Sequence, residues 1–314
     1  MALLLPACAP GGVPSQSAGI QPTAPPDASA SPVAAFPVTI VDDENTAVAI
    51  KAEPQRIASL SPANTETVFA LGAGDRLVGG TDADDYPAEA AALADLATYQ
   101  GVVMGRLVAA DPDLVLAAGK GFNPPADIAR IRELGIPVIV LYADDVPGVL
   151  HDIELIGEAI GAGEAAEAMT SAMAARIDAI SAATAAVPQP RTFYELGAEP
   201  ELYGPADESF VADMVTLAGG EPITTGSTTA FSLSLERLVT EDPEVIVLGD
   251  ANYGTTAEQV VARPGWDVMS AVKARAIRPV DDIIVTRPGP RLADGLAALA
   301  LAIHPDLVLP TPEP

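Results

Sequence analysis

The sequence is poor in the residue types on which many enzymes and metal sites depend. It has one cysteine, Cys8, so no disulfide can form within the chain. Its two histidines, His151 and His304, stand far apart, and neither lies in a catalytic or metal-binding motif. A zinc or manganese site of clustered histidines is therefore not expected, nor is a nucleophile–histidine pair. We predict no catalytic residue, no cofactor and no metal site built from the protein's own side chains.

Positive charge is also scarce. The 314 residues include 16 Lys and Arg against 43 Asp and Glu, a formal net charge of −27. Such a surface repels phosphate backbones and anionic lipids, so nucleic-acid binding is disfavoured, as is membrane adhesion by charge alone. The simplest reading of the acidity is that it keeps the protein soluble. No apolar run reaches the roughly 18 residues that a membrane-spanning helix needs.

The amino terminus has the pattern of a tether. Met1–Cys8 is a short apolar run with a small residue before the cysteine, as at the end of a secretory signal with a lipoprotein cleavage box. It lacks a basic segment, so the natural start is expected upstream of Met1; a chance cysteine in a frayed terminus is the alternative. Residues 9–35, rich in Ala, Pro, Ser, Gly and Thr, predict a disordered spacer. We expect lipidation at Cys8.

The remainder alternates short β-rich runs with helical patterns, which predicts parallel βαβ units. Residues 36–41 and 47–50 are expected to form a small hairpin. The strands that we predict are 57–60, 114–116, 138–141, 192–196 and 245–248, and the helices are 64–71, 126–134 and 210–217.

One unit occurs in both halves. Arg106–Leu116 matches Arg237–Val247 in its pattern of a short helix, an acidic residue, Pro, and a buried strand. Between the halves, residues 147–187 have no strand signal and carry apolar residues at helical spacing. We therefore predict an α/β protein with two Rossmann-like lobes, 36–145 and 188–308, joined by a long helical connection, 146–187. Residues 1–8 would be the signal remnant, 9–35 the tether and 309–314 a tail.

Several stretches, in this order and spacing, resemble the helical-backbone metal-receptor superfamily. They are Arg56–Glu66, Thr81–Pro87, Pro112–Leu116, Ala218–Glu221, Gly265–Trp266 and Arg287–Arg291. These proteins are the solute-binding subunits of ABC importers for iron–siderophores, haem and cobalamin. The resemblance covers about residues 36–308. It implies the class III periplasmic-binding-protein fold, a monomer, an ABC permease as partner, and an extracytoplasmic location on the outer face of the cell membrane.

The resemblance also implies a ligand site between the lobes, on loops at the carboxyl ends of strands, in agreement with the rule for open α/β sheets. Arg287 is the strongest candidate because its planar fork suits carboxylate or phosphate groups; the alternative is a structural salt bridge. Tyr99 matches a cobalamin-stacking aromatic of the family and Tyr203 falls near another, with half-buried core positions as the alternative. Arg291 is expected to be structural, and Trp266 to pack in the core. The candidate ligand-binding residues are Ser61, Asn64, Asp84, Tyr86, Tyr99, Gln100, Phe122, Tyr203, Tyr253 and Arg287.

Family members dock on the permease through one exposed Glu in each lobe. Glu236, just before Arg237, matches one of them, and an ordinary helix-start carboxylate is the alternative. The equivalent position before Arg106 is Gly105, which departs from the pattern. We expect either asymmetric docking or a substitute acid such as Asp95 or Asp111.

The expected function is capture of a metal chelate for import. Six Phe, six Tyr and one Trp are few for holding a flat macrocycle, which favours a ferric siderophore over cobalamin or haem. An enzyme and a surface-adhesion protein are the rival classes, and both lack a motif in this sequence.

Overall fold

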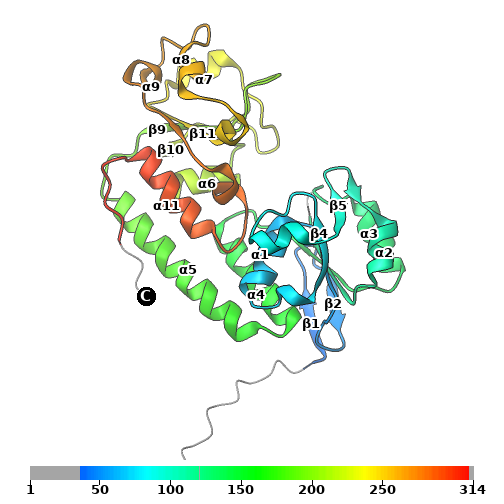
Figure 1. The fold of residues 1–314 in the computed structure, drawn as a ribbon. Helices are drawn as coiled ribbons and strands as arrows, with labels where there is room; N and C mark the ends of the chain where they lie inside the picture. Colours follow the sequence, from blue (N-terminus) through cyan, green and yellow to red (C-terminus); the bar gives the residue numbers. More distant parts are fainter. Residues whose placement is uncertain (1–35, 120, 311–314) are drawn as a thin grey trace, which may run out of the picture. The chain divides into compact units, whose positions relative to one another are not determined.

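A computed structural model describes residues 36–119 and 121–310 of the chain (Figure 1). The predicted fold class, two α/β lobes joined by long helices, is confirmed. Cys8 and the proposed tether lie outside the described residues.

The N-terminal lobe is built on a six-stranded sheet in the order β6-β5-β4-β3-β7-β8. All neighbours are parallel except β5 and β6. Parallel strands need crossover connections, and short helices provide them here. A separate antiparallel hairpin, β1 with β2, precedes the sheet, as predicted. The strands are β1 (Val38–Val41), β2 (Ala47–Ile50), β3 (Ile57–Ser59), β4 (Leu77–Thr81), β5 (Asp95–Thr98), β6 (Gly101–Val102), β7 (Leu114–Ala118) and β8 (Val138–Leu141), and the helices are α1 (Pro62–Ala70), η1 (Gly74–Arg76), η2 (Ala88–Ala92), α2 (Met104–Ala110) and α3 (Pro125–Glu133).

The C-terminal lobe has a four-stranded, wholly parallel sheet in the order β10-β9-β11-β12. One of the two central strands, β11, is buried along its whole length, as its continuous Val-Ile-Val-Leu run predicts. The elements are β9 (Arg191–Glu195), α6 (Phe210–Leu217), β10 (Glu221–Pro222), α7 (Leu235–Glu241), β11 (Val245–Leu248), η3 (Gly249–Tyr253), α8 (Ala257–Val261), α9 (Ser270–Ala274), β12 (Ile277–Pro279), α10 (Asp282–Thr286) and α11 (Leu292–Ile303).

Two consecutive helices, α4 (Val146–Ile160) and α5 (Gly163–Thr184), occupy the stretch that the sequence assigns to the connection. The side chain of Asp145 caps α4, and Gly161, with φ +78°, ends it in a left-handed conformation. Helix α5 packs against α4 and α11 (Figure 1).

A single apolar core runs through both lobes. One continuous cluster of buried side chains includes Ile139 of β8, Ile153 of α4, Ile177 of α5, Leu296 of α11 and Val247 of β11. Burial of this kind stabilises by about 25 cal/mol per Å² of apolar surface, so the helices α4, α5 and α11 fasten the lobes to each other by packing. Smaller clusters complete the core on the far side of each sheet.

The repeated sequence unit is also a repeated structure, formed by α2–β7 and by α7–β11. Each helix ends at an aspartate in the left-handed conformation, Asp111 at φ 46° and Asp242 at φ 45°. In each lobe an arginine closes the end of that helix: Arg56 Nε donates to the Asp111 carbonyl (2.8 Å), and Arg191 Nε to the Asp242 carbonyl (3.1 Å). In both lobes an arginine side chain therefore supplies a hydrogen-bond donor to the carbonyl at the end of the helix.

Candidate ligand-binding cavity

A mostly apolar cavity of about 570 Å³ is lined by residues of both lobes. From the N-terminal lobe it receives the loops that follow β3, β4, β5, β7 and β8, which is the carboxyl end of that sheet. From the C-terminal lobe it receives Tyr253, the helix α10 and Arg287. Its volume lies within the range of small-molecule sites, about 300–1,000 Å³.

Six of the ten sequence-predicted ligand residues line this cavity. They are Ser61, Asn64, Tyr99, Phe122, Tyr253 and Arg287. The other four lie outside its lining, and their contacts are described below. Whether any of the ten binds ligand stays a prediction.

Three large aromatic side chains stand open to solvent on the cavity wall. Tyr99 is 90% exposed, Tyr253 81% and Phe122 80%. Folded proteins rarely leave rings of this size exposed in one place unless they meet a partner or ligand. Such rings offer large, rigid faces for stacking on a flat or bulky molecule.

Two buried asparagines hold the loops at the end of the N-terminal sheet. Asn123 accepts from the Ala118 N–H (2.7 Å) and donates to the Leu60 carbonyl (3.1 Å). Asn64 donates to the Ala117 carbonyl (3.4 Å). Both line the cavity, and their amides link the loops that follow β3 and β7. Asn123 stands in a candidate loop, but the sequence does not single it out, because its partner Leu60 lies 63 residues away.

The four predicted residues outside the lining have other contacts. Asp84 is buried and accepts from the Thr65 hydroxyl (2.9 Å) and from the Thr81 N–H (2.9 Å). Gln100 donates to the Tyr99 hydroxyl (3.1 Å), so it touches a lining residue. The backbone of Tyr203 pairs with Gly197 and Ser232. Tyr86 lies beneath an arginine, described next.

Arg287 forms ion pairs across the lobes. Its guanidinium lies 2.5 Å from Glu66 Oε1 and 2.7 Å from Asp85 Oδ1, both in the N-terminal lobe. Arg291 binds both oxygens of Glu66 (2.9 and 2.6 Å) and stacks 4.1 Å from the Tyr86 ring centre. Burial lowers the pKa of Arg287, but the hydrogen bonds of Asp85 and Glu66 outweigh it and raise the pKa overall. The structural role expected for Arg291 is confirmed, and the salt bridge weighed for Arg287 is present.

The cavity wall is acidic where it is charged. Asp82, Asp152 and Asp282 line it, and Arg287 is the one cation among the described lining residues. Asp282 accepts from the Tyr194 hydroxyl (2.7 Å), and burial raises its pKa. Burial, the charge of Asp43 and a hydrogen bond with Asp43 raise the pKa of Asp152 to about 8.

Sequence reasoning did not single out Asp152. The available signal was its position on α4 at helical spacing from Val149 and Ile156, both of them buried. A carboxyl group on an apolar helix face must find a partner or lose its charge. That signal points to a special environment but does not say that the environment is a cavity.

In the C-terminal lobe a buried ion pair supports the end of β9. Arg263 binds both oxygens of the fully buried Glu195 (2.6 and 2.7 Å) and lies 4.6 Å from the centre of the Trp266 ring. Trp266 is 5% exposed, which confirms the packing role expected from sequence. Burial raises the pKa of Glu195, although Arg263 acts in the opposite direction.

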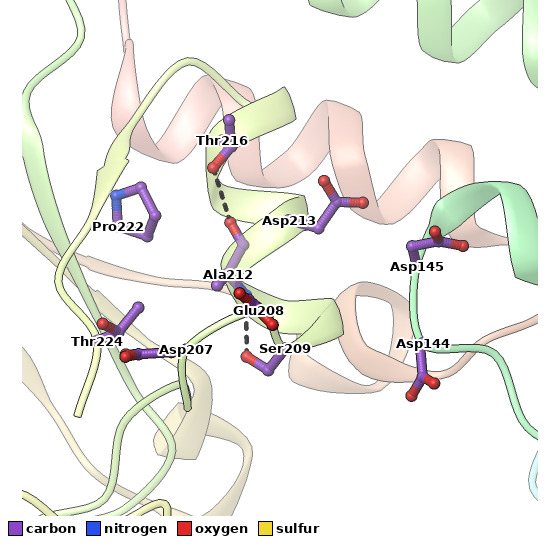
Figure 2. A pocket seen from close by; sticks show the side chains of 10 residues that line it. All are labelled: Asp144, Asp145, Asp207, Glu208, Ser209, Ala212, Asp213, Thr216, Pro222 and Thr224. Carbon is purple, nitrogen blue, oxygen red and sulfur yellow. Dashed lines mark hydrogen bonds between the residues drawn. The ribbon is translucent and has the colours of Figure 1, made fainter. Parts of the chain in front are cut away.

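A second pocket, of about 440 Å³, is more acidic and has no aromatic lining residue (Figure 2). Its carboxylates point in different directions (Figure 2), and the half-buried Asp213 accepts from the Val146 N–H (3.4 Å). Burial and the neighbouring Asp145 raise the pKa of Asp213, against the effect of that N–H. Nothing else marks this pocket as a ligand site. Its acidic residues are Asp144, Asp145, Asp207, Glu208 and Asp213.

The two positions considered for docking occupy equivalent places. Gly105 and Glu236 are each the second residue of their helix, α2 and α7, and both are exposed. Ser234 caps α7 by accepting from the Arg237 N–H (3.2 Å). Within residues 36–119 and 121–310, no helix is both long and apolar enough to cross a bilayer. The same residues contain no group of three or more His, Cys, Asp or Glu side chains that could hold a metal ion.

Residues 57–283 match the model of a protein family described as periplasmic binding protein. The chain belongs to this family. An uncharacterized ABC transporter substrate-binding lipoprotein of Bacillus subtilis, YvrC, is 34% identical over 276 residues, 86% of this chain and 87% of the relative. A cobalamin-binding protein of Halobacterium salinarum is 31% identical over 296 residues, 88% of this chain and 77% of the relative.

Solved structures share the fold. The crystal structure of the periplasmic vitamin B12-binding protein BtuF of Vibrio cholerae has a TM-score of 0.71 at 24% identity. The match covers 80% of this chain and 97% of that one. The fold is therefore that of the class III periplasmic binding proteins, as the sequence resemblance implied.

Proposed function

We propose that the protein is the substrate-binding subunit of an ABC importer and that it captures a corrinoid such as cobalamin in the cavity that both lobes line. The observation that carries the choice is the cavity wall itself: three exposed aromatic rings around a surface whose one described cation is already paired. The relatives that bind cobalamin and vitamin B12 support the same assignment.

Charge argues against a ligand with several carboxylates. Haem carries two propionates, which favour arginine or lysine partners. Here Arg287 is bound to Glu66 and Asp85, and the nearby lining adds Asp82, Asp152 and Asp282. An anionic ligand would therefore have to displace an ion pair and approach carboxyl groups.

Hydrogen-bonding chemistry fits a corrinoid better. The corrin ring carries neutral carboxamide groups at its edge, which donate N–H and accept through their carbonyls. The wall offers hydroxyl, amide and carboxyl groups that complement them, while the rings supply apolar contact. The polar lining residues are Ser61, Asn64, Thr67, Thr81, Asp82, Thr98, Asn123, Asp152, Asp282 and Thr286.

A ferric siderophore is the second candidate, and the size of the cavity favours it. About 570 Å³ suits a drug-sized molecule, whereas a corrinoid is larger and would extend past the exposed rings into solvent. An uncharged or cationic chelate would meet the acidic wall without the repulsion that an anionic one faces.

A ligand panel separates these candidates. The full-length protein is heated with cyanocobalamin, a neutral ferric hydroxamate, an anionic ferric catecholate or haem, each in excess. A ligand that binds the folded state raises the unfolding midpoint by mass action. We expect the largest rise with cyanocobalamin. A rise confined to a ferric chelate would move the assignment to the second candidate.

Paired variants then test the site. Tyr99→Ala and Tyr253→Ala should each weaken cyanocobalamin binding about two- to tenfold, since an aromatic contact contributes roughly 0.5–1.5 kcal/mol beyond its area. Phe231→Ala is the matched control, because Phe231 is an exposed ring outside the cavity lining. Equal affinities for all three variants and the wild type would refute the proposed site.

The proposal includes an extracytoplasmic location with a lipid anchor on Cys8, and delivery to a permease that Glu236 contacts. The lipoprotein relative YvrC and the exposure of Glu236 support these two parts. The gene expressed from its natural start, with Cys8→Ser as the comparison, tests the anchor. Equal membrane association of both forms in detergent partitioning would exclude lipidation at this residue.

A further inference from the structure

A pair of carboxyl groups at the cavity wall joins the connecting helix α4 to the N-terminal lobe. Asp152 lines the cavity from α4, and Asp43 lies behind it in the turn between β1 and β2. The two side chains are hydrogen-bonded to each other. Two carboxylates in direct contact cannot both carry a charge without strong repulsion, so such a pair holds a proton.

The surroundings decide which carboxyl group carries the proton. The Asp43 carboxylate accepts from the Tyr142 N–H (2.5 Å), so a fixed backbone donor already holds one of its oxygens. Asp152 lies on an apolar face of α4 between the buried Val149 and Ile153, and burial disfavours its charged form. The proton therefore stays on Asp152, which donates a hydrogen bond to Asp43. Because Asp152 also lines the cavity, its second oxygen can accept a hydrogen bond from a ligand.

We propose that Asp152 serves the binding site as a neutral acid, its proton shared with Asp43, and that a bulky uncharged ligand locks this proton in place so that binding weakens as the solution becomes alkaline. The inference rests on the proposed function, since it concerns the same ligand in the same cavity. It adds the chemical class recognised at this wall: a neutral hydrogen-bond donor such as a carboxamide, not a cation.

The sign of the linkage follows from desolvation. A ligand that fills the cavity removes water from Asp152 and disfavours the carboxylate further, so the complex holds the proton to higher pH than the free protein does. At pH values between the pKa of Asp152 in the free protein and its higher pKa in the complex, binding takes up as much as one proton. In that range the affinity falls by at most tenfold for each pH unit. A cationic ligand would do the reverse, because it would stabilise the carboxylate and release the proton.

Two of the charged groups on elements that pack against α4 are held in ion pairs with the C-terminal lobe. The elements that pack on α4 are α1, α5, α6 and β1. Glu66 of α1 binds Arg287 and Arg291, and Arg176 of α5 binds Asp294 (2.5 Å). The remaining ionisable groups on these elements, on α4 or on the cavity wall are Asp42, Asp43, Glu44, Asp82, Tyr99, Tyr142, Asp145, His151, Glu154, Glu158, Glu164, Glu167, Asp178, Asp213, Tyr253 and Asp282.

The test is the affinity for cyanocobalamin, which has no ionisable group of its own in the range, at intervals from pH 7 to pH 9. We expect the wild-type dissociation constant to rise with pH over the upper half of this range, where Asp152 ionises. Asp152→Asn is permanently neutral and should give a constant affinity across it. Asp82→Asn, which removes an exposed carboxyl group of the same cavity, should keep the wild-type dependence.

Calorimetry in two buffers of different ionisation enthalpy measures directly how many protons are taken up when the ligand binds. Near pH 8.5 the wild type should take up a fraction of a proton per ligand, and Asp152→Asn none. A wild-type affinity that does not change with pH, or net proton release, would overturn the proposal while leaving the proposed ligand intact.

A measurement without ligand tests the shared proton independently of the proposed ligand. In a carbon NMR titration of aspartate carboxyl groups, one signal should titrate near pH 8 in the wild type and be absent from Asp152→Asn. If cyanocobalamin does not bind at any pH, the proposed function fails and the linkage with it, but the NMR titration still decides whether the proton is shared. If every aspartate signal titrates below pH 6, the shared proton itself is refuted.

Discussion

Neutralising Glu66 should be among the most destabilising single changes in this protein. Its side chain is 3% exposed, and it accepts from Arg287 (2.5 Å) and from Arg291 (2.9 and 2.6 Å). These arginines are themselves largely buried, with side-chain exposures of 15% and 22%. Removing the charge therefore leaves two buried cations short of a partner.

The size of the loss can be worked out from the contacts that remain. Breaking a buried ion pair by removing one partner costs about 3–5 kcal/mol. In Glu66→Gln, Arg287 keeps Asp85 and Arg291 keeps the Tyr86 ring, and the new amide still offers one carbonyl. We therefore expect the lower end, a loss of about 3 kcal/mol in the free energy of unfolding.

Urea unfolding of the full-length protein at pH 7 measures this loss. Arg106→Gln is the control, because Arg106 and Asp95 form an exposed pair (3.5 Å, side chains 59% and 48% exposed) that should contribute less than about 1 kcal/mol. The apolar core shared by both lobes further predicts one cooperative transition for both variants. A loss below about 1 kcal/mol for Glu66→Gln would refute the reasoning, since the buried network would then be worth no more than a surface pair.

Three further predictions concern other sites. Asp152→Asn should stabilise the protein increasingly from pH 4 to pH 8, because Asp152 loses its proton near pH 4 in the unfolded chain and only near pH 8 in the folded one. Urea unfolding should find a gain in the free energy of unfolding of at most roughly 5 kcal/mol at pH 8 and none at pH 3. Glu195→Gln should cost about 3 kcal/mol or more in the same assay, because it leaves Arg263 unpaired beside a fully buried side chain. Glu236→Ala should lower uptake in cells without changing the affinity of the purified protein, and Gly105→Glu should leave uptake unchanged or raise it; a matching loss of affinity would place Glu236 in the site or the core instead.

Much of the fold could be predicted because its strands are continuous apolar runs. Val138–Leu141 and Val245–Leu248 were expected as strands and are strands with those bounds. The strand β4 was missed, since its Leu-Val-Gly-Gly-Thr sequence has a weak β signal. The structure gives the reason for the glycines: a Cβ on Gly79 would lie 2.5 Å from Leu96, and one on Gly80 would lie 2.0 Å from Asp84 Oδ2.

The candidate site was less predictable because its decisive contacts join distant residues. The sequence placed Arg287 on a loop at the cavity, but its partner Glu66 lies 221 residues away. Likewise, the partner of Asp152 is in a hairpin turn that precedes the sheet. Sequence periodicity identifies which face of a helix is buried, but it cannot say which charged groups from elsewhere meet on that face.

The preference for a siderophore rested on the low count of aromatic residues in the whole chain. The arrangement in space matters more than the count, because three of these rings stand exposed on one cavity wall. This is why we favour the larger, flatter corrinoid over the chelate that composition alone suggested.

Titration of the full-length protein with cyanocobalamin by isothermal calorimetry at pH 7 tests the central claim most directly. We predict one molecule bound per chain with a dissociation constant below about 1 µM, equivalent to roughly −8 kcal/mol or tighter. No binding heat at either of two temperatures with cyanocobalamin at 100 µM, together with tight binding of a ferric siderophore under the same conditions, would contradict it.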